Sequence, residues 1–134
     1  MTIREGGCLC GGVRYRVTGE LRDVIACHCQ QCRRTTGHFF ANTDARRSDF
    51  RLLRDDSLRH YESSPGIHRS FCGTCGATLF WERLGGEQIS VAAGTFDGPT
   101  GLKLACHIFT AFKGDYYELE PDLPQHAEWP PKDG

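Results

Sequence analysis

The sequence has no long hydrophobic run and no strong excess of charge of either sign. Its 134 residues carry a formal net charge of -1, so we expect no long-range attraction to nucleic acid or to an anionic membrane. No apolar stretch approaches the roughly 20 residues that a bilayer-spanning helix needs. The first residues, from Met1 to Gly6, lack the apolar segment of a signal peptide. We therefore expect a cytoplasmic protein with no membrane partner and no nucleic-acid partner.

Sustained helical periodicity is also missing. Short alternating runs separated by turn residues indicate a mainly β protein with minor short helices. Extended segments are expected at 13–17, 24–27, 38–41, 50–54, 58–61, 68–71, 77–83, 88–93 and 107–112. One short helix is expected at 30–36, ended by Gly37, and the tail from about residue 121 is expected to be irregular. No repeat or linker interrupts residues 1–134, which are expected to form one domain, and nothing in the pattern indicates an oligomeric state.

Cysteine is the residue type with the most informative spacing. Eight cysteines in 134 residues are about 6% of the chain, below the roughly 8–10% typical of small disulfide scaffolds, and a reducing cytosol disfavours disulfides. Their clustering is typical of metal ligands. The groups are Cys8-x-Cys10, Cys27-x-Cys29-x2-Cys32, Cys72-x2-Cys75 and a single Cys106.

The Cys72-x2-Cys75 turn, followed by glycine, is the most specific of these groups. Such a turn presents two thiolates to one metal ion, with backbone N–H groups close to the sulfurs. Two ligands do not complete a tetrahedron, and the glycine-flanked pair Cys8 and Cys10 is the candidate for the other two. The four cysteines would then form a closed zinc site, which is structural in character and contributes folding free energy.

The triplet Cys27, Cys29 and Cys32 offers three ligands to one further ion. Side chains alternate along an extended segment, so Cys27 and Cys29 should share a side while His28 points away, packed or hydrogen-bonded. An open zinc with three protein ligands would act as a Lewis acid or bind a thiolate, and a second closed site using a histidine is the alternative. We expect Cys106 to be a small buried residue. The candidates for the fourth position are water, a substrate thiolate, His28, His107 and Cys106.

The order of these motifs resembles that of a known family over residues 7–125. The segments that carry the resemblance are Cys8-Leu-Cys10-Gly-Gly-Val-Arg-Tyr, Cys27-His-Cys29-Gln-Gln-Cys32-Arg-Arg-Thr-Thr-Gly37, Arg69-Ser-Phe-Cys72-Gly-Thr-Cys75-Gly76, Ala93-Gly-Thr-Phe-Asp97, His107-Ile-Phe109 and Asp122-Leu-Pro-Gln125. They are similar to the motifs of the glutathione-dependent formaldehyde-activating (GFA) family, whose eukaryotic relatives include centromere protein V. The resemblance implies a single-domain β-tent of short antiparallel sheets that holds two zinc ions. It implies a structural zinc on Cys8, Cys10, Cys72 and Cys75 and a catalytic zinc on Cys27, Cys29 and Cys32.

The resemblance also implies an activity. The name-giving reaction adds glutathione to formaldehyde, so we expect a zinc-dependent carbon–sulfur lyase that joins glutathione or a similar thiol to a small aldehyde, or catalyses the reverse. Asp97 and His107 match family positions and would serve as general acid or base, or as partners of a zinc ligand. Arg69 also matches and would contact a substrate anion or form a structural ion pair. The alternative function is a non-catalytic, zinc-stabilised binding module.

Overall fold

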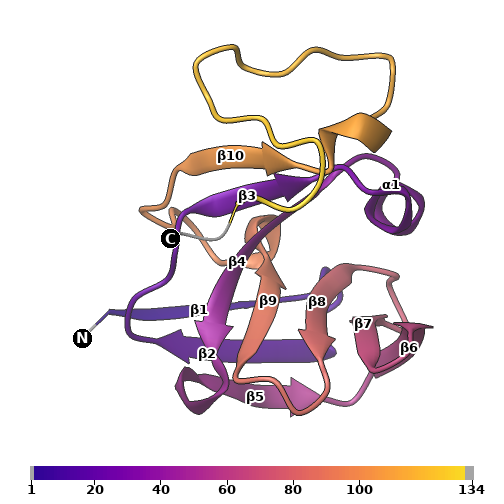
Figure 1. Ribbon diagram of the computed structural model, residues 1–134. Helices are drawn as coiled ribbons and strands as arrows, with labels where there is room; N and C mark the ends of the chain where they lie inside the picture. The colour runs from indigo at the N-terminus through magenta and orange to yellow at the C-terminus, as the bar shows by residue number, and fades with distance from the viewer. Residues whose placement is uncertain (1, 132–134) are drawn as a thin grey trace. The chain divides into compact units, whose positions relative to one another are not determined.

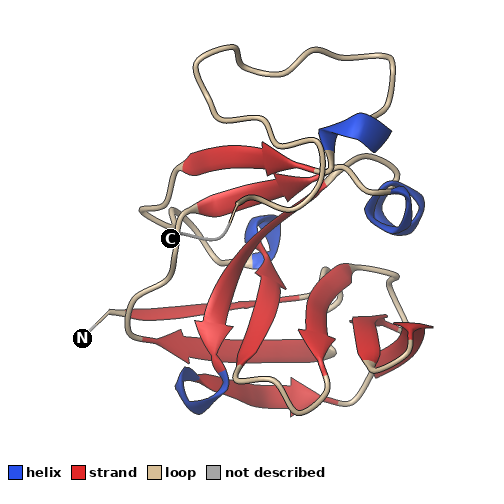
Figure 2. Ribbon diagram, viewed as in Figure 1, coloured by secondary structure: helices blue, strands red, loops and turns tan. Residues whose placement is uncertain are grey.

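The computed structural model describes residues 2–131, which form two compact units. The first unit comprises the chain up to Arg22 together with Thr43–Leu102, and the second comprises Asp23–Asn42 together with the chain from Lys103 onward. Strands predominate, as Figure 2 shows, so the expectation of a mainly β fold with minor short helices is confirmed. The expected single domain stays a prediction, and residues 132–134 of its tail lie outside the described residues.

The first unit contains two sets of antiparallel strands. One is a three-stranded sheet in the order β1-β2-β5. The other has the order β9-β8-β7-β6, with the end of β4 next to β9. The strands are β1 (Ile3–Gly7), β2 (Val13–Thr18), β4 (Phe40–Arg46), β5 (Phe50–Asp55), β6 (Leu58–Ser64), β7 (Ile67–Cys72), β8 (Thr78–Arg83) and β9 (Gln88–Ala92). Two 3₁₀ turns accompany them, η1 (Arg47–Asp49) and η2 (Ala93–Thr95).

Alternation along β2 creates the core of this unit. Val13, Tyr15 and Val17 are fully buried on one side of the strand, while the residues between them are partly exposed. The Tyr15 ring packs edge-on against Phe80, with ring centroids 5.4 Å apart, and is stacked with Phe50 at 5.7 Å. This aromatic cluster anchors β2 and, through the pairing of the two strands, β1. The turn between β1 and β2 carries Cys8 and Cys10.

The second unit is built around a parallel strand pair. β10 (Leu104–Ile108) runs parallel to β3 (Val24–Cys27), as Figure 1 shows, and β3 pairs antiparallel with the start of β4. The helix α1 (Gln30–Thr36) follows β3, and the 3₁₀ turn η3 (Thr110–Phe112) follows β10. This parallel pair is an exception to the antiparallel pairing that was expected of the sheets. No helix in residues 2–131 has the length and apolar character to cross a membrane.

Two expected strands are displaced along the chain. The strand predicted at 38–41 is β4, which begins at Phe40 and continues to Arg46. The strand predicted at 107–112 is β10, which ends at Ile108, because Phe109 adopts a left-handed conformation with φ of 56° that breaks the extended backbone. Residues 110–112 then form η3 instead of continuing the strand. The expected segments 50–54 and 58–61 are strands; β5 pairs with β2, and β6 pairs with β7.

Candidate metal centres

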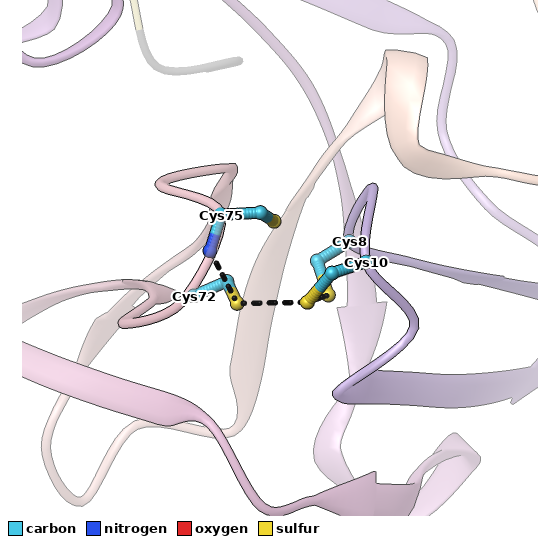
Figure 3. Close-up of side chains that lie close together, drawn as sticks. All are labelled: Cys8, Cys10, Cys72 and Cys75. Carbon is cyan, nitrogen blue, oxygen red and sulfur yellow. Dashed lines mark hydrogen bonds between the residues drawn. The ribbon is translucent and has the colours of Figure 1, made fainter.

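Four cysteine sulfurs of the first unit lie together, as Figure 3 shows. The Sγ atom of Cys10 lies 3.6 Å from that of Cys8 and 3.6 Å from that of Cys72, and Cys75 completes the group. Zinc–sulfur bonds of about 2.3 Å in a tetrahedron place sulfurs about 3.8 Å apart, whereas a disulfide requires about 2.05 Å. None of the eight cysteines forms a disulfide. The spacing of the sulfurs therefore fits a four-thiolate zinc site.

The turn between β7 and β8 presents two of these thiols. The Cys72 N–H donates to the Ala77 carbonyl at 3.0 Å, and the Gly76 N–H donates back to the Cys72 carbonyl at 2.9 Å. Gly76 has a φ of 79°, a conformation that side chains disfavour, so glycine is required where the turn closes. The expected C-x2-C hairpin is confirmed in its backbone geometry.

The other two thiols come from the connection between β1 and β2. The Cys8 N–H donates to the Val13 carbonyl at 3.1 Å, and the Val13 N–H donates to the Cys8 sulfur at 3.2 Å. Gly11 closes this turn with a φ of 83°. Two glycine-closed turns, 62 residues apart at Cys10 and Cys72, thus supply one group of ligands.

Cys72 lies in an environment that favours its thiolate. The Ser57 hydroxyl lies 3.1 Å from the Cys72 sulfur, and the backbone N–H groups of Thr74 and Cys75 donate to it at 3.3 Å. The Ser57 hydrogen bond, followed by these amides, lowers the pKa of Cys72 to about 5. The Gly12 amide acts to lower the pKa of Cys10, but hydrogen bonds with the Cys72 and Cys8 thiols outweigh it and raise that pKa to about 11. Ser57 belongs to no recognisable motif, so the sequence did not predict its contact with Cys72.

The second unit brings Cys27, Cys29 and Cys32 together. Their sulfurs lie within 4.8 Å of one another, and among residues 2–131 no further His, Cys, Asp or Glu atom joins the group. Cys27 ends β3, and Cys29 is the N-cap of α1, where its sulfur accepts the Cys32 N–H at 3.3 Å. The helix ends at Gly37, which has a φ of 81° and donates its N–H to the Arg33 carbonyl. A strand end and the first turn of a helix therefore converge on one centre.

The crowding of these thiols is itself informative. Hydrogen bonding to Cys29 and Cys32, followed by burial, strongly raises the pKa of Cys27, because both effects favour its neutral thiol, and repulsion from a Cys32 thiolate adds to them. A divalent cation at the centre of the group reverses this effect and deprotonates its ligands. The donor set is one that zinc prefers.

Two buried histidines of the same unit are engaged elsewhere. His28 Nδ1 lies 2.5 Å from the Tyr117 hydroxyl, and its Nε2 lies 2.8 Å from His107 Nδ1. His107 Nε2 lies 3.1 Å from a Glu120 carboxylate oxygen. Both ring nitrogens of each histidine therefore have hydrogen-bond partners, as expected for His28, and neither histidine is in the thiol group. Burial, followed by the charge of His107, lowers the pKa of His28 to about 4, so this ring is neutral at pH 7.

Tyr117 and Glu120 complete this chain of hydrogen bonds, and the sequence analysis missed both. They lie in the run Asp115-Tyr116-Tyr117-Glu118-Leu119-Glu120, just before the expected irregular tail, and the mixture of aromatic and acidic residues in this run is the available signal. Their partners are 89 and 13 residues away along the chain, respectively, so spacing alone could not reveal the contacts.

The remaining predicted residues are Asp97, Arg69 and Cys106, and none of them belongs to either thiol group. Asp97 is exposed and forms a two-pronged ion pair with Arg14, at 3.1 and 2.5 Å, which lowers the pKa of the Asp97 carboxyl. Arg69 is buried on β7. Both belong to the first unit, whereas the triplet belongs to the second. Cys106 is partly exposed on β10, so the expectation that it is buried is wrong, and a register shift between Leu104 and Cys106 interrupts the regular alternation there.

The fold and the two thiol groups define a mainly β protein with cysteine clusters suited to metal. The model of the family described as "glutathione-dependent formaldehyde-activating enzyme" matches residues 3–112, and the chain belongs to this GFA family. It is 26% identical over 117 residues to a protein of Schizosaccharomyces pombe named as an uncharacterized lyase. This match covers 86% of this chain and 84% of that protein. It is also similar to the crystal structure of a Rhodobacter sphaeroides protein, with 32% identity and a TM-score of 0.59, covering 72% of this chain and 91% of the other.

Proposed function

We propose that this protein is a zinc-dependent carbon–sulfur lyase of the GFA type. It would add a thiol, glutathione or a similar one, to formaldehyde or a related small aldehyde, or catalyse the reverse reaction. The observation that carries the proposal is the difference between the two thiol groups, four sulfurs in one and three in the other. Membership of the GFA family and the lyase-named relative support the reaction class.

The two thiol groups are assigned different tasks. Cys8, Cys10, Cys72 and Cys75 would fill all four positions of a structural zinc. Cys27, Cys29 and Cys32 would hold a second zinc and leave one position for a substrate. Zinc bound there would supply a Lewis acid that stabilises a substrate thiolate or polarises a carbonyl oxygen.

The overall reaction balances without any oxidant or reductant. The thiol sulfur forms a bond to the aldehyde carbon, the carbonyl π bond breaks, and the thiol proton ends on the former carbonyl oxygen. In the reverse direction the carbon–sulfur bond breaks and the hydroxyl proton is returned. The reaction therefore requires a bound thiol, an oriented carbonyl and one proton transfer.

His107 is assigned a positioning role in this reaction. It holds His28 at 2.8 Å, and His28 lies between the ligands Cys27 and Cys29 in the chain. The buried pair thereby orients the segment that carries the thiols. Asp97 and Arg69 are assigned to the support of the first unit, in keeping with the Arg14–Asp97 ion pair and the burial of Arg69.

The test combines metal analysis with an NMR assay of ¹³C-formaldehyde and thiols. The wild-type protein should contain two zinc ions per chain and accelerate exchange between free and thiol-bound formaldehyde. Cys29→Ser should lose one zinc and the acceleration while keeping its circular dichroism spectrum. Cys106→Ser is the matched control, because Cys106 belongs to neither thiol group, and it should keep both ions and the activity.

Two outcomes would contradict the proposal. One is full activity in the Cys29→Ser variant, which would remove the triplet from the reaction. The other is a protein with two bound zinc ions that accelerates exchange with no thiol tested, which would favour a non-catalytic binding module.

A further inference from the structure

The first unit carries a third cluster of metal-ligating side chains, and it contains no cysteine. His60 on β6, His68 on β7 and Glu82 on β8 bring their ligand atoms within 4.8 Å of one another. We propose that these three residues form a binding site for a divalent transition-metal ion of the zinc type, separate from both thiol groups. The proposal does not depend on the lyase function.

Strand register brings the three residues together. His68 is directly opposite Glu82 in the antiparallel β7–β8 pair, which places their side chains on one face. His60 is opposite Ser70 in the β6–β7 pair, diagonal to His68. The two imidazole rings are stacked, with centroids 5.4 Å apart and an interplanar angle of 26°. Three consecutive strands therefore each contribute one ligand to the same patch.

The two histidines offer nitrogen donors in a supported arrangement. His60 Nδ1 lies 2.7 Å from the hydroxyl of Ser70, which is itself buried. When Nδ1 carries the proton and donates it to Ser70, Nε2 keeps the lone pair that binds a metal. A hydrogen bond to the second ring nitrogen is the usual partner of a metal-bound histidine, because it fixes the ring and its tautomer.

Glu82 supplies an oriented carboxylate. Its Oε2 lies 2.6 Å from a guanidinium nitrogen of Arg47, and its side chain is 12% exposed. The ion pair fixes the orientation of this carboxylate and leaves Oε1 as a ligand atom. Two imidazoles and one carboxylate are a donor set for zinc and for other first-row divalent ions, with the remaining position open to water.

The three ligand atoms must move slightly closer together when a metal ion binds. Zinc bonds of about 2.0–2.2 Å in a tetrahedron place ligand atoms about 3.3 Å apart, against the 4.8 Å limit within which these atoms lie. His60 is exposed on β6, the terminal strand of its sheet, so its side chain has room to turn toward the ion. A bound ion would link that edge strand to β7 and β8 and so protect it from other strand pairings.

The test is a titration of the holoprotein as purified, with its cysteine-bound metal retained, using Zn²⁺ as the probe. Imidazole ¹⁵N resonances are followed by long-range ¹H–¹⁵N correlation spectra. The expected result is a saturable shift of the His60 and His68 resonances that is complete at one added ion per chain. His68→Gln and Glu82→Gln should each weaken binding at least about tenfold, because each removes one of three ligands.

Matched variants separate this site from general surface binding. Glu87→Gln removes an exposed carboxylate of the same unit and should bind as wild type. If Glu82→Gln disturbs the Arg47 ion pair, His60→Asn provides a second test of the site, because His60 is exposed. Backbone amide spectra report whether each variant keeps its fold. Absence of His60 and His68 shifts at millimolar Zn²⁺ would overturn the site, as would equal affinity in wild type and His68→Gln, or equal weakening in Glu87→Gln and Glu82→Gln.

Discussion

Tyr15 shows how a single side chain supports the first unit. Its ring is fully buried, and its hydroxyl lies 2.6 Å from Thr95 Oγ1, which itself donates to the Ala92 carbonyl at 2.7 Å. Tyr15→Phe removes that hydrogen bond with little change of shape. The free energy of unfolding at pH 7 should fall by about 0.5–1.5 kcal/mol, measured by urea denaturation. An unchanged midpoint would show that the hydrogen bond contributes nothing net.

The same residue predicts a pH dependence. Burial, opposed by the Thr95 hydrogen bond, raises the pKa of the Tyr15 hydroxyl well above its usual value of about 10. The unfolded state therefore loses this proton first, so stability is full below about pH 10 and falls as the pH rises further. Wild type should lose more stability than Tyr15→Phe between pH 9.5 and pH 11. Parallel curves for the two proteins would contradict the shift.

Gly12 is predicted to control the environment of the four-thiol group. A Cβ at this position would overlap the Ser57 hydroxyl, which hydrogen-bonds the Cys72 sulfur. Gly12→Ala should displace Ser57 and weaken zinc retention about tenfold, measured by competition with a chelator. Gly94→Ala is the control, because a Cβ there meets no atom within 4 Å. Equal zinc retention in both variants would remove Ser57 from the support of the site.

At the scale of elements, local signals predicted structure well and long-range pairing poorly. The helix α1 has the predicted bounds, because its end at Gly37 depends on neighbouring residues. The β7–β8 hairpin was likewise recognisable from one turn motif. β10 was misplaced because its partner β3 is about 80 residues away, and parallel pairing leaves no turn signal in the sequence. The left-handed conformation that ends β10 is adopted by Phe109 and not by a glycine, so the sequence gives no sign of this break in the strand.

β3 and β10 are joined by side chains as well as by backbone pairing. His28 follows β3 and His107 lies on β10, and their buried rings share a 2.8 Å hydrogen bond. His107→Ala leaves His28 Nε2 without this partner and should lower the free energy of unfolding by about 1–3 kcal/mol. Amide hydrogen exchange should accelerate in both strands. Cys106→Ser, on the same strand, is the control and should change little; similar losses in both variants would point to β10 itself and not to the histidine pair.

At the scale of the molecule, the cysteine pairs and the triplet were recognisable because their spacing is local information, whereas the union of Cys8 and Cys10 with Cys72 and Cys75 was inferred from the four ligands that a tetrahedron needs. Cys27, Cys29 and Cys32 lie within six residues, and their convergence needs one strand end and one helical turn. The surrounding hydrogen bonds were not predictable. Ser57 meets Cys72 and Tyr117 meets His28 through tertiary folding, and no residue between them in the chain signals these contacts.

The division of the chain into two units predicts that metal loss acts differently in each. Cys75 belongs to the group that joins the β1–β2 turn to the β7–β8 turn, so Cys75→Ser opens a long-range cross-link in the first unit. A loss of about 3 kcal/mol would lower the Tm by roughly 10–15 °C for a chain of this size. Cys29→Ser breaks a group whose ligands are close in sequence, and a short closed loop restrains the unfolded chain less. Its Tm should therefore fall by less than half as much.

Calorimetry with zinc analysis measures both effects, and hydrogen exchange assigns each to its unit. A larger loss in Cys29→Ser would mean that the triplet, and not the four-cysteine group, holds the structural metal.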